Sequence, residues 1–527
     1  MDPARPVVEA VVASGDRILY AGGAREAQSM LGPSARQIDL RGRTMIPGFI
    51  ESHGHLMALG YSLRELDLSH AESYAEITEM VRTAAARAKP GEWIIGNGWH
   101  QDKWKTPPDR IVNGFQTHEL LSAASPHNPV LLHHASGHAV QVNAMAMTLA
   151  GIRGDTEVAG GEVIRDRDGE ATGILTENAM QLVLDAVPEK TPAGNQQALS
   201  LALAELARNG ITSFEDAGAS RTDIETFRAM LARGRPSVRL WVMLAGWEPD
   251  LIGEWLSKGP EIDHDPNYLT IRAIKMLADG ALGSRGAWLL APYSDRPGHY
   301  GAPLIPMEAV LHMGQQALQH GFQLCVHAIG DRTNREVLNQ FEILFGGRHS
   351  GARFRIEHAQ HLSAADIPRF GQLGVIASMQ GIHLSSDRPW AIDRLGLARI
   401  EEGTYVWRKL LDAGAMIING TDVPVEPVNP IASYYALVTR KTLAGTPEGG
   451  YEPSQKLTRM EALRTYTRDA AYGAFEEDIK GSIEVGKLAD FTILSGDLVT
   501  VPEDQLLALR VEQTIVGGRI VYAGEHE

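Results

Sequence analysis

Eight short apolar segments, spread between residues 44 and 422, constrain the fold of this chain more than any other feature. Helical stretches, for example residues 195–210, separate most of them. Strands that alternate with helices are typical of parallel sheets, and eight such units predict a (β/α)₈ barrel of the TIM type, in the α/β class. The segments are TMIPGFIES, ITSFEDAG, VRLWVML, LTIRAIKM, FQLCVHAIG, RFRIEHAQ, GVIASMQ and AMIINGTD.

The two ends of the chain share a different pattern. VVEAVVASGDRILYAGG, near the N-terminus, has apolar residues with period two around an SGD turn, which predicts a β-hairpin. Short β segments separated by Gly and Asp recur in GSIEVGKLADFTILSGD and VEQTIVGGRIVYAGE, near the C-terminus. We therefore predict that residues 1–44 and 480–527 form one small β-sandwich domain, and that residues 45–479 form the barrel.

Residues 61–190 are too many for a simple connection between the first two barrel strands. This segment contains its own helical pattern, YAEITEMVRTAAARAKPG, two apolar runs, and a turn in GGEVIRDRDGEATG. We predict that the insertion is a lid or rim subdomain over the mouth of the barrel.

Side chains that bind metals stand at the ends of several predicted strands. In a barrel, the C-terminal ends of the strands converge on one site. Residues two apart in a strand point to the same side, so His53 and His55 can present two nitrogens to one ion, with Gly54 between them. Imidazole and carboxylate are ligands that suit Zn²⁺. The predicted ligands are His53, His55, Lys275, His327, His358 and Asp422.

Lys275 is the unusual member of this set, because a protonated ammonium would repel a cation. A neutral lysine can react with CO₂ to give a carbamate, whose two oxygens could bridge two metal ions. Taken singly, these residues have ordinary interpretations: His327 as a buried histidine, Lys275 as an ion-paired lysine, and Asp422 as a turn residue. The occurrence of all six at predicted strand ends favours the metal site.

Motifs along nearly the whole chain resemble the amidohydrolase superfamily, and specifically its YtcJ-like branch, which includes N-substituted formamide deformylase. The resemblance implies a (β/α)₈ barrel with a β-sandwich built from both chain ends. It also maps the family's metal ligands onto the six residues above, with a carboxylated Lys275 bridging two zinc ions. The motifs are PGFIESHGHL, GWHQDKW, SGHAVQVNAMAM, TGILTENA, IKMLADGALGSRGA, VHAIGDR, RIEHAQ, SMQGIHLSSD, NGTDVPV and GSIEVGKLADFTIL.

The expected reaction is metal-dependent hydrolysis of a non-peptide C–N bond, such as the amide of an N-formyl or N-acyl amine, by metal-activated hydroxide. Asp422 would be catalytic, as general base towards water and then as acid towards the leaving nitrogen. A mononuclear deaminase or deacylase of a small nitrogen compound is an alternative, although the superfamily's deaminases lack the bridging lysine. A non-catalytic scaffold relative is an alternative of another class, and such proteins typically lose metal ligands.

Seven further residues have weaker assignments. Trp99 could equally pack in a core, and Arg285 could equally brace Asp279. His383 and Asp387 follow the seventh predicted strand and could rim the pocket. The residues expected to contact the substrate are His138, Trp99, Arg285 and His383, and those expected to support the metal ligands are Glu177 and Asp279.

The composition of the chain limits which partners it could bind and in which compartment we expect it. A formal net charge of −16 argues against nucleic acid or an anionic membrane as a partner. Cys325 is the single cysteine, so no internal disulfide can form. The first residues lack the basic and apolar regions of a signal peptide, and no apolar run is long enough to span a membrane. We therefore expect a cytoplasmic protein, and the resemblance implies a small-molecule amide substrate. Members of the superfamily often form dimers, so the resemblance also makes a homodimer a candidate assembly.

Overall fold

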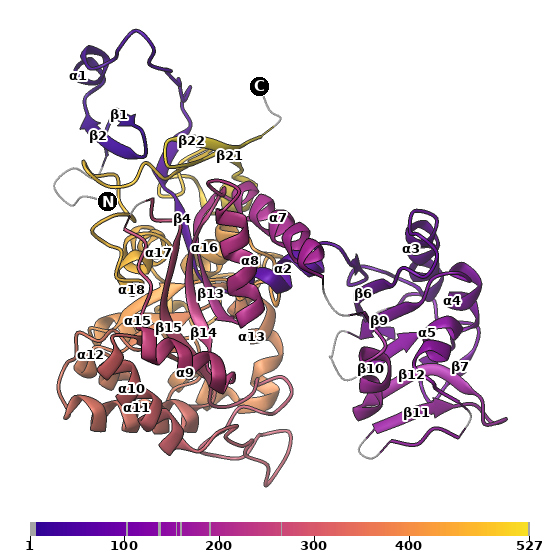
Figure 1. The fold of residues 1–527 in the computed structure, drawn as a ribbon. Coiled ribbons are helices and arrows are strands. Elements are labelled where there is room, and N and C mark those ends of the chain that lie inside the picture. The colour runs from indigo at the N-terminus through magenta and orange to yellow at the C-terminus, as the bar shows by residue number, and fades with distance from the viewer. Residues whose placement is uncertain are drawn as a thin grey trace. The chain divides into compact units, whose positions relative to one another are not determined.

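The eight predicted strands pair into one parallel sheet in the computed structural model, which describes residues 7–101, 104–134, 139–153, 155–158, 161–188, 191–264 and 266–524 (Figure 1). The order in the sheet is β19-β18-β17-β16-β15-β14-β13-β4, so strands adjacent in space follow one another along the chain. The strands are β4 (Phe49–Gly54), β13 (Ile211–Ala219), β14 (Arg239–Ala245), β15 (Leu269–Leu277), β16 (Gln323–Ala328), β17 (Arg355–His358), β18 (Ile376–Met379) and β19 (Met416–Asn419).

The sheet closes where the segment after β19 meets the end of β4. Asp422 N donates to His53 O at 2.8 Å, and His55 N donates to Val423 O at 2.8 Å. These bonds form a parallel bridge between Gly54 and Val423. The prediction of a TIM-like barrel is therefore confirmed, and the closure itself brings Asp422 to the two histidines of the first strand.

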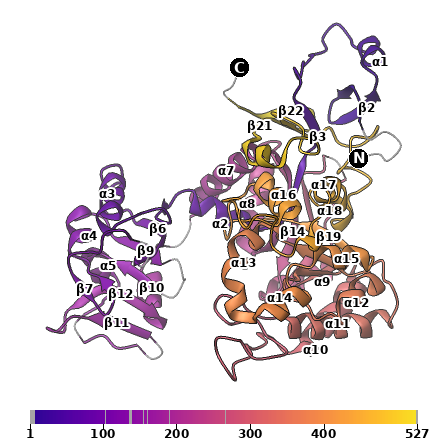
Figure 2. The same cartoon turned by 180° about the vertical axis from the view of Figure 1, so that it is seen from behind.

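Helices lie around the barrel strands (Figures 1 and 2). Their ends follow local capping rules: Ser220 and Asp223 form a capping box at α8, and α10 ends at Gly321, whose φ of 80° suits glycine. No helix among the described residues is both long and apolar enough to cross a membrane. The helices are α2 (Leu56–Ser62), α7 (Pro192–Arg208), α8 (Arg221–Leu231), α9 (Pro249–Lys258), α10 (Met307–His320), α11 (Asp331–Phe345), α12 (Ile367–Leu373), α13 (Gly381–Leu395), α14 (Leu397–Gly403), α15 (Trp407–Asp412), α16 (Pro430–Thr439), α17 (Arg459–Thr465) and α18 (Arg468–Gly473).

The first predicted barrel strand divides into two elements, which corrects the sequence assignment. Residues Thr44–Pro47 form β3, which pairs antiparallel with β20 (Phe491–Leu494) in a separate sheet, and only the part from Phe49 onward enters the barrel. Gly48 lies between the two strands, where a Cβ would lie 2.7 Å from Cβ of Thr212. The apolar run is continuous in sequence, so periodicity alone does not show this change of sheet.

Both chain ends contribute to the small sheets, as predicted from their β patterns. β3 and β20 continue into β21 (Val511–Val516) and β22 (Arg519–Ala523), and the predicted hairpin forms from β1 (Ala10–Ser14) and β2 (Arg17–Gly22). Ile18 N donates to Lys487 O at 2.9 Å, which ties the hairpin to the C-terminal segment. Ile18 also packs in one apolar cluster with residues of β20 and β21.

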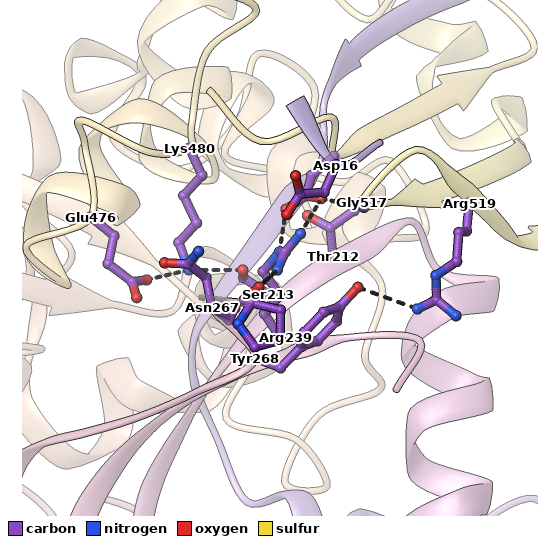
Figure 3. A network of polar contacts seen from close by, with 12 residues as sticks. Asp16, Thr212, Ser213, Arg239, Asn267, Tyr268, Glu476, Lys480, Gly517 and Arg519 are labelled. Atoms are coloured by element: carbon purple, nitrogen blue, oxygen red, sulfur yellow. Dashed lines mark hydrogen bonds and ion pairs between the residues drawn. The ribbon is translucent and has the colours of Figure 1, made fainter. Parts of the chain in front are cut away.

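A polar network joins the terminal sheet to the barrel (Figure 3). Arg239, at the start of β14, donates to Asp490 through Nε at 2.7 Å and through Nη2 at 3.1 Å, and both side chains are buried. Gly517 N also donates to Asp490 Oδ1, at 2.8 Å. Nearby, Lys480 donates to Ser213 at 2.8 Å. The charges are thus paired at the point where the two parts of the fold meet.

Residues Ala58–Ala198 form a compact unit of their own. Among its described residues, the sheet order is β11-β12-β10-β9-β6-β5, and apolar clusters cover both faces. The predicted turn in GGEVIRDRDGEATG joins β11 to β12, and the predicted helix is α3 (Tyr74–Ala85). A role as lid or rim stays a prediction. The other elements are α4 (Glu119–Ala124), α5 (Ala144–Leu149), α6 (Gln181–Leu184), β5 (Leu66–Asp67), β6 (Ile94–Trp99), β7 (Ile111–Val112), β8 (Phe115–Gln116), β9 (Val130–His134), β10 (Ala139–Val142), β11 (Gly161–Arg165) and β12 (Ala171–Glu177).

Candidate metal centre

The end of β4 presents His53 and His55 at the mouth of the barrel. His53 is completely buried, and its Nδ1 lies 2.5 Å from Oε2 of the buried Glu357. A carboxylate in that position holds the ring proton on Nδ1, which leaves Nε2 free to bind a metal. Gly54 is required by packing, because a Cβ there would lie 2.7 Å from Phe214 Cζ and 2.9 Å from Val423 Cγ1.

Asp422 completes a compact triad with these histidines. Its Oδ1 lies 3.2 Å from Nε2 of His55 and 3.5 Å from Nε2 of His53. One ligand atom from each of the three residues lies within 4.8 Å of the others. Among the described residues this is the one group of three or more such side chains that is close enough to hold a single ion.

His327 and His358 lie beside the triad at the ends of the fifth and sixth barrel strands. The ring centroids are 4.5 Å apart between His327 and His358, and 4.8 Å apart between His358 and His53. His358 Nδ1 lies 2.7 Å from Gln380 Oε1, so its Nε2 is the free ring nitrogen. The structure therefore brings the four predicted histidines together.

Lys275 also reaches this group, from the fourth strand, β15. Its side chain is buried, and Nζ lies 3.3 Å from Nε2 of His53. Burial lowers the pKa of the Lys275 amine, although the nearby carboxylates of Glu357 and Asp422 act in the opposite direction. Lys275 Nζ therefore lies next to the ring nitrogen of His53 that is free to bind a metal. This position is compatible with the predicted role of Lys275 as a metal ligand or bridge.

The residues present fit a divalent metal. Burial lowers the pKa of His53 and His358, and it lowers the pKa of His327 to about 3, so these rings are neutral. Burial acts to raise the pKa of Asp422, but the neighbouring imidazoles hold it well below its usual range. Neutral imidazole and ionised carboxylate are the forms that bind metals. His327 Nε2 and Asp422 Oδ1 are buried and make no hydrogen bond within the described part of the chain.

Two buried glutamates at this site were missed by the sequence analysis. Glu357 orients His53, and Glu51 accepts a hydrogen bond from Thr421 N at 2.5 Å, next to Asp422 in the chain. Burial raises the pKa of Glu51 to about 8. Glu51, His53 and His55 share a period of two in a buried strand, so this spacing was a usable signal for Glu51. Glu357 precedes His358 directly, and nothing in that pair indicates which histidine the carboxylate meets.

His383 and Asp279 lie near the site, as predicted. The His383 ring stacks on His358 with centroids 6.2 Å apart. Asp279 accepts hydrogen bonds from three backbone N–H groups and from Thr333, so it holds the turn after β16 together. Its Oδ1 lies 3.5 Å from His327 Nε2. Support of a metal ligand by Asp279 is consistent with this position.

Two of the predicted substrate contacts are not supported. The guanidinium of Arg285 is held by Asp295, with contacts of 3.2 and 2.7 Å, and it does not brace Asp279. Trp99 is completely buried in the core of its own unit, where its indole N–H donates to Leu132 O at 2.9 Å. A large apolar ring packs there instead of lining a pocket. His138 and the side chain of Glu177 lie outside the described residues, so their assignments stay predictions.

Known proteins match both the sequence and the fold. Residues 36–522 match the model of the "Amidohydrolase family". The putative amidohydrolase YtcJ of Bacillus subtilis is 32% identical over 93% of this chain and 91% of its own length. The N-substituted formamide deformylase of Arthrobacter pascens is 27% identical over 99% and 96%.

A solved structure of a similar protein has the same fold. An uncharacterized metal-dependent hydrolase from Pyrococcus horikoshii superimposes with a TM-score of 0.78, covers 94% of this chain and 95% of its own, and is 27% identical. The structural comparison agrees with the barrel fold, and the family match covers nearly the whole chain. The chain therefore belongs to the amidohydrolase family, in its YtcJ-like branch, and is a hydrolase that acts on carbon–nitrogen bonds.

Proposed function

We propose that this protein hydrolyses a non-peptide amide bond, such as that of an N-formyl or N-acyl amine, with the help of bound divalent metal. The observation that carries the proposal is the triad of His53, His55 and Asp422, with ligand atoms within 4.8 Å of one another at the barrel mouth. The similarity to a formamide deformylase supports an amide of this kind.

Zinc is the metal that these ligands suit best, since imidazole and carboxylate groups are its usual partners in hydrolases. His53, His55 and Asp422 would hold it, and His327, His358 and Lys275 would hold a second ion or complete the coordination. When bound, such an ion lowers the pKa of a water molecule to about 7 and so supplies a nucleophile at neutral pH.

Asp422 has the position for the proton transfers. Oδ1 faces His53 and His55 and makes no hydrogen bond within the described part of the chain. It would take the proton of the attacking water and deliver it to the leaving nitrogen, which departs as a neutral amine. Thr421 N, which donates to Glu51, and Asp422 N, which donates to His53 O, fix the backbone that carries this carboxylate.

Lys275 would act in modified form. Its neutral amine adds to CO₂ and loses one proton, which gives a carbamate with two oxygens directed at the ligand group. Intact-mass measurement under non-denaturing conditions tests this, because the modification adds the mass of one CO₂ to the metal-loaded chain and is lost in Lys275→Ala. The same mass for both proteins, after correction for the substitution, would exclude the carbamate.

The metal count separates the proposal from its nearest rival. We expect about two zinc ions per chain by elemental mass spectrometry on protein purified without chelator. A count near one would favour the mononuclear deaminase or deacylase, and Lys275 would then be structural. Asp422→Asn should lower kcat on an N-formyl amine by at least about a hundredfold, the usual contribution of a general base. Full activity in a metal-loaded Asp422→Asn protein would exclude the proton-transfer role.

A further inference from the structure

Three polar side chains lie beside the metal centre, over the last strands of the barrel, and we call them the acidic subsite: His383, Asp387 and Glu426. His383 and Asp387 belong to α13, which is labelled in Figure 2 and follows β18 in the chain, and Glu426 follows β19. His383 stacks on His358, and Glu426 comes four residues after Asp422. Beside the effect of burial, His383 acts to lower the pKa of both Asp387 and Glu426, and Asp387 acts to raise that of Glu426. The subsite is therefore continuous with the reaction site.

The two carboxyl groups of the subsite have no lysine or arginine partner among the described residues. Asp387 and Glu426 are partly buried, and neither forms an ion pair with a lysine or arginine within the described ranges. Burial raises the pKa of both carboxyls, against the hydrogen bond of Ser386 to each of them and those of Tyr405 and Gln360 to Asp387. A cation from outside would supply the stabilisation that the chain does not.

Asp387 is held in place for such a role. Its Oδ2 accepts hydrogen bonds from Gln360 at 3.0 Å and from Tyr405 at 3.1 Å. Gln360 and Tyr405 also contact each other. Oδ1 has only a long contact of 3.5 Å with Ser386. One carboxylate oxygen is thus anchored, and the other is available.

A second observation that indicates a bound ligand is the unpartnered ring nitrogen of His383. The residue is 7% exposed, and its Nε2 is buried and makes no hydrogen bond with any described residue. A buried nitrogen without a partner is costly unless a bound group satisfies it. The three side chains do not gather closely enough to hold a metal ion, since the one such group among the described residues is the triad of the metal centre. A larger organic cation, which offers several N–H donors over a wider span, fits the arrangement.

We propose that the acidic subsite binds an ammonium group carried by the substrate, so that the preferred substrates are amides bearing a second, cationic nitrogen. This inference rests on the proposed function for the reaction itself. The ammonium would donate to Asp387 and Glu426, and to the free nitrogen of His383, while the amide lies at the metal centre.

Binding of two alcohols tests the subsite without any turnover. The metal-loaded protein is titrated with 6-aminohexan-1-ol and with its uncharged analogue hexan-1-ol in a calorimeter. The amino alcohol should bind about tenfold more tightly, the effect of one charge-assisted hydrogen bond of moderate strength. This preference should vanish in the double variant Asp387→Asn/Glu426→Gln. Equal binding of both alcohols, no binding of the amino alcohol, or an unchanged preference in the variant would each overturn the proposal.

A matched control has the same charge change elsewhere. Asp393→Asn/Glu401→Gln neutralises two exposed carboxylates on α13 and α14, and it should keep the preference for the amino alcohol. The single variants Asp387→Asn and Glu426→Gln are measured as well, so that a folding defect in the double variant leaves the test intact. Loss of the preference in the exposed control would show a general effect of net charge and would overturn the proposal.

Hydrolysis rates of a cationic and a neutral amide then test the subsite separately from the hydrolysis itself. We expect kcat/KM for the mono-N-formyl derivative of hexane-1,6-diamine to exceed that for N-formylhexylamine by about tenfold. The double variant should lose this ratio, because kcat/KM falls more for the cationic amide than for the neutral one. If neither amide is hydrolysed, the proposed function fails, while the binding measurements still decide whether the cation site exists.

Discussion

His358 and Asp422 have backbone φ values of 77° and 60°, in a region that residues other than glycine rarely adopt. A regular strand would direct Glu357 and His358 to opposite faces, yet Glu357 bonds to His53 and His358 packs against the same ring. The left-handed turn at His358 brings both side chains to one site. Such a conformation costs about 1–3 kcal/mol, which the surrounding packing must offset.

Glu357→Gln should weaken metal binding by about 10- to 100-fold, the usual effect of removing a carboxylate that orients a ligating histidine. The amide keeps the size of the side chain but removes the charge that holds the Nδ1 proton of His53. Competition with a chromogenic chelator measures the affinity. Glu401→Gln, an exposed glutamate on α14, is the control and should bind metal like the parent. Unchanged affinity in Glu357→Gln would show that His53 is oriented by other contacts.

Asp469 predicts a pH dependence of stability that is separate from the metal centre. Burial raises its pKa from the ordinary value of 3.8 to about 6, against the influence of Arg464 and Arg468. Because the folded-state pKa lies above the unfolded one, the contribution of this group is complete below pH 3.8 and is lost as the pH rises through 6.

The difference in free energy of unfolding between the parent and Asp469→Asn should therefore shift by up to about 3 kcal/mol in favour of the variant between pH 4 and 7. Urea unfolding at several pH values measures it. Asp393→Asn, an exposed aspartate, should show no such shift. If the free energy of unfolding changed with pH in the same way for the parent and for Asp469→Asn, this would contradict the raised pKa of Asp469.

At the scale of elements, β4 contributes both to the barrel and to the site. Its last residue, Gly54, forms the bridge that closes the barrel, and this end of the strand carries His53, with His55 directly after it. Gly54 allows both, because Phe214 and Val423 fill the space where its Cβ would lie. At Gly48, between β3 and β4, Thr212 likewise occupies the space where a Cβ would lie.

Gly54→Ala should destabilise the fold by about 1–3 kcal/mol, the usual cost of overpacking, and should weaken metal binding as the histidines shift. Gly253→Ala is the matched control. Gly253 lies inside α9 with open space around its Cβ position, so alanine should stabilise that helix by about 0.5–1 kcal/mol. Chemical denaturation of both variants gives the comparison. A Gly54→Ala protein as stable as the parent would mean that Phe214 can move aside at no cost.

At the scale of the whole molecule, a buried charge pair holds the C-terminal part of the chain against the barrel. Asp490 accepts from Arg239 and from Gly517 N, and the Tyr268 ring lies under the guanidinium, with 4.4 Å between Arg239 Cζ and the ring centroid. Figure 3 shows Arg239, Tyr268 and Gly517 drawn together at this junction. A buried pair contributes little net stability, but removal of one partner leaves an unpaired buried charge.

Asp490→Asn should lower the free energy of unfolding by about 3–5 kcal/mol, because Arg239 would remain buried without its counter-charge. Unfolding in urea, followed by circular dichroism, measures this. Glu254→Gln breaks an exposed pair with Arg221 and should leave the midpoint nearly unchanged. Similar midpoints for the two variants would show that the terminal sheet does not depend on this pair.

The sequence by itself determined the barrel and the β character of both chain ends, and it predicted the side chains at the strand ends. These follow from period, strand order and the geometry of a parallel barrel, which are local or topological properties. Only the tertiary structure decided that Glu357 meets His53, that Arg285 pairs with Asp295, and that the apolar run from residue 44 divides between two sheets. Each of these depends on a contact between residues far apart in the chain, and no pattern within one strand encodes its partner in another.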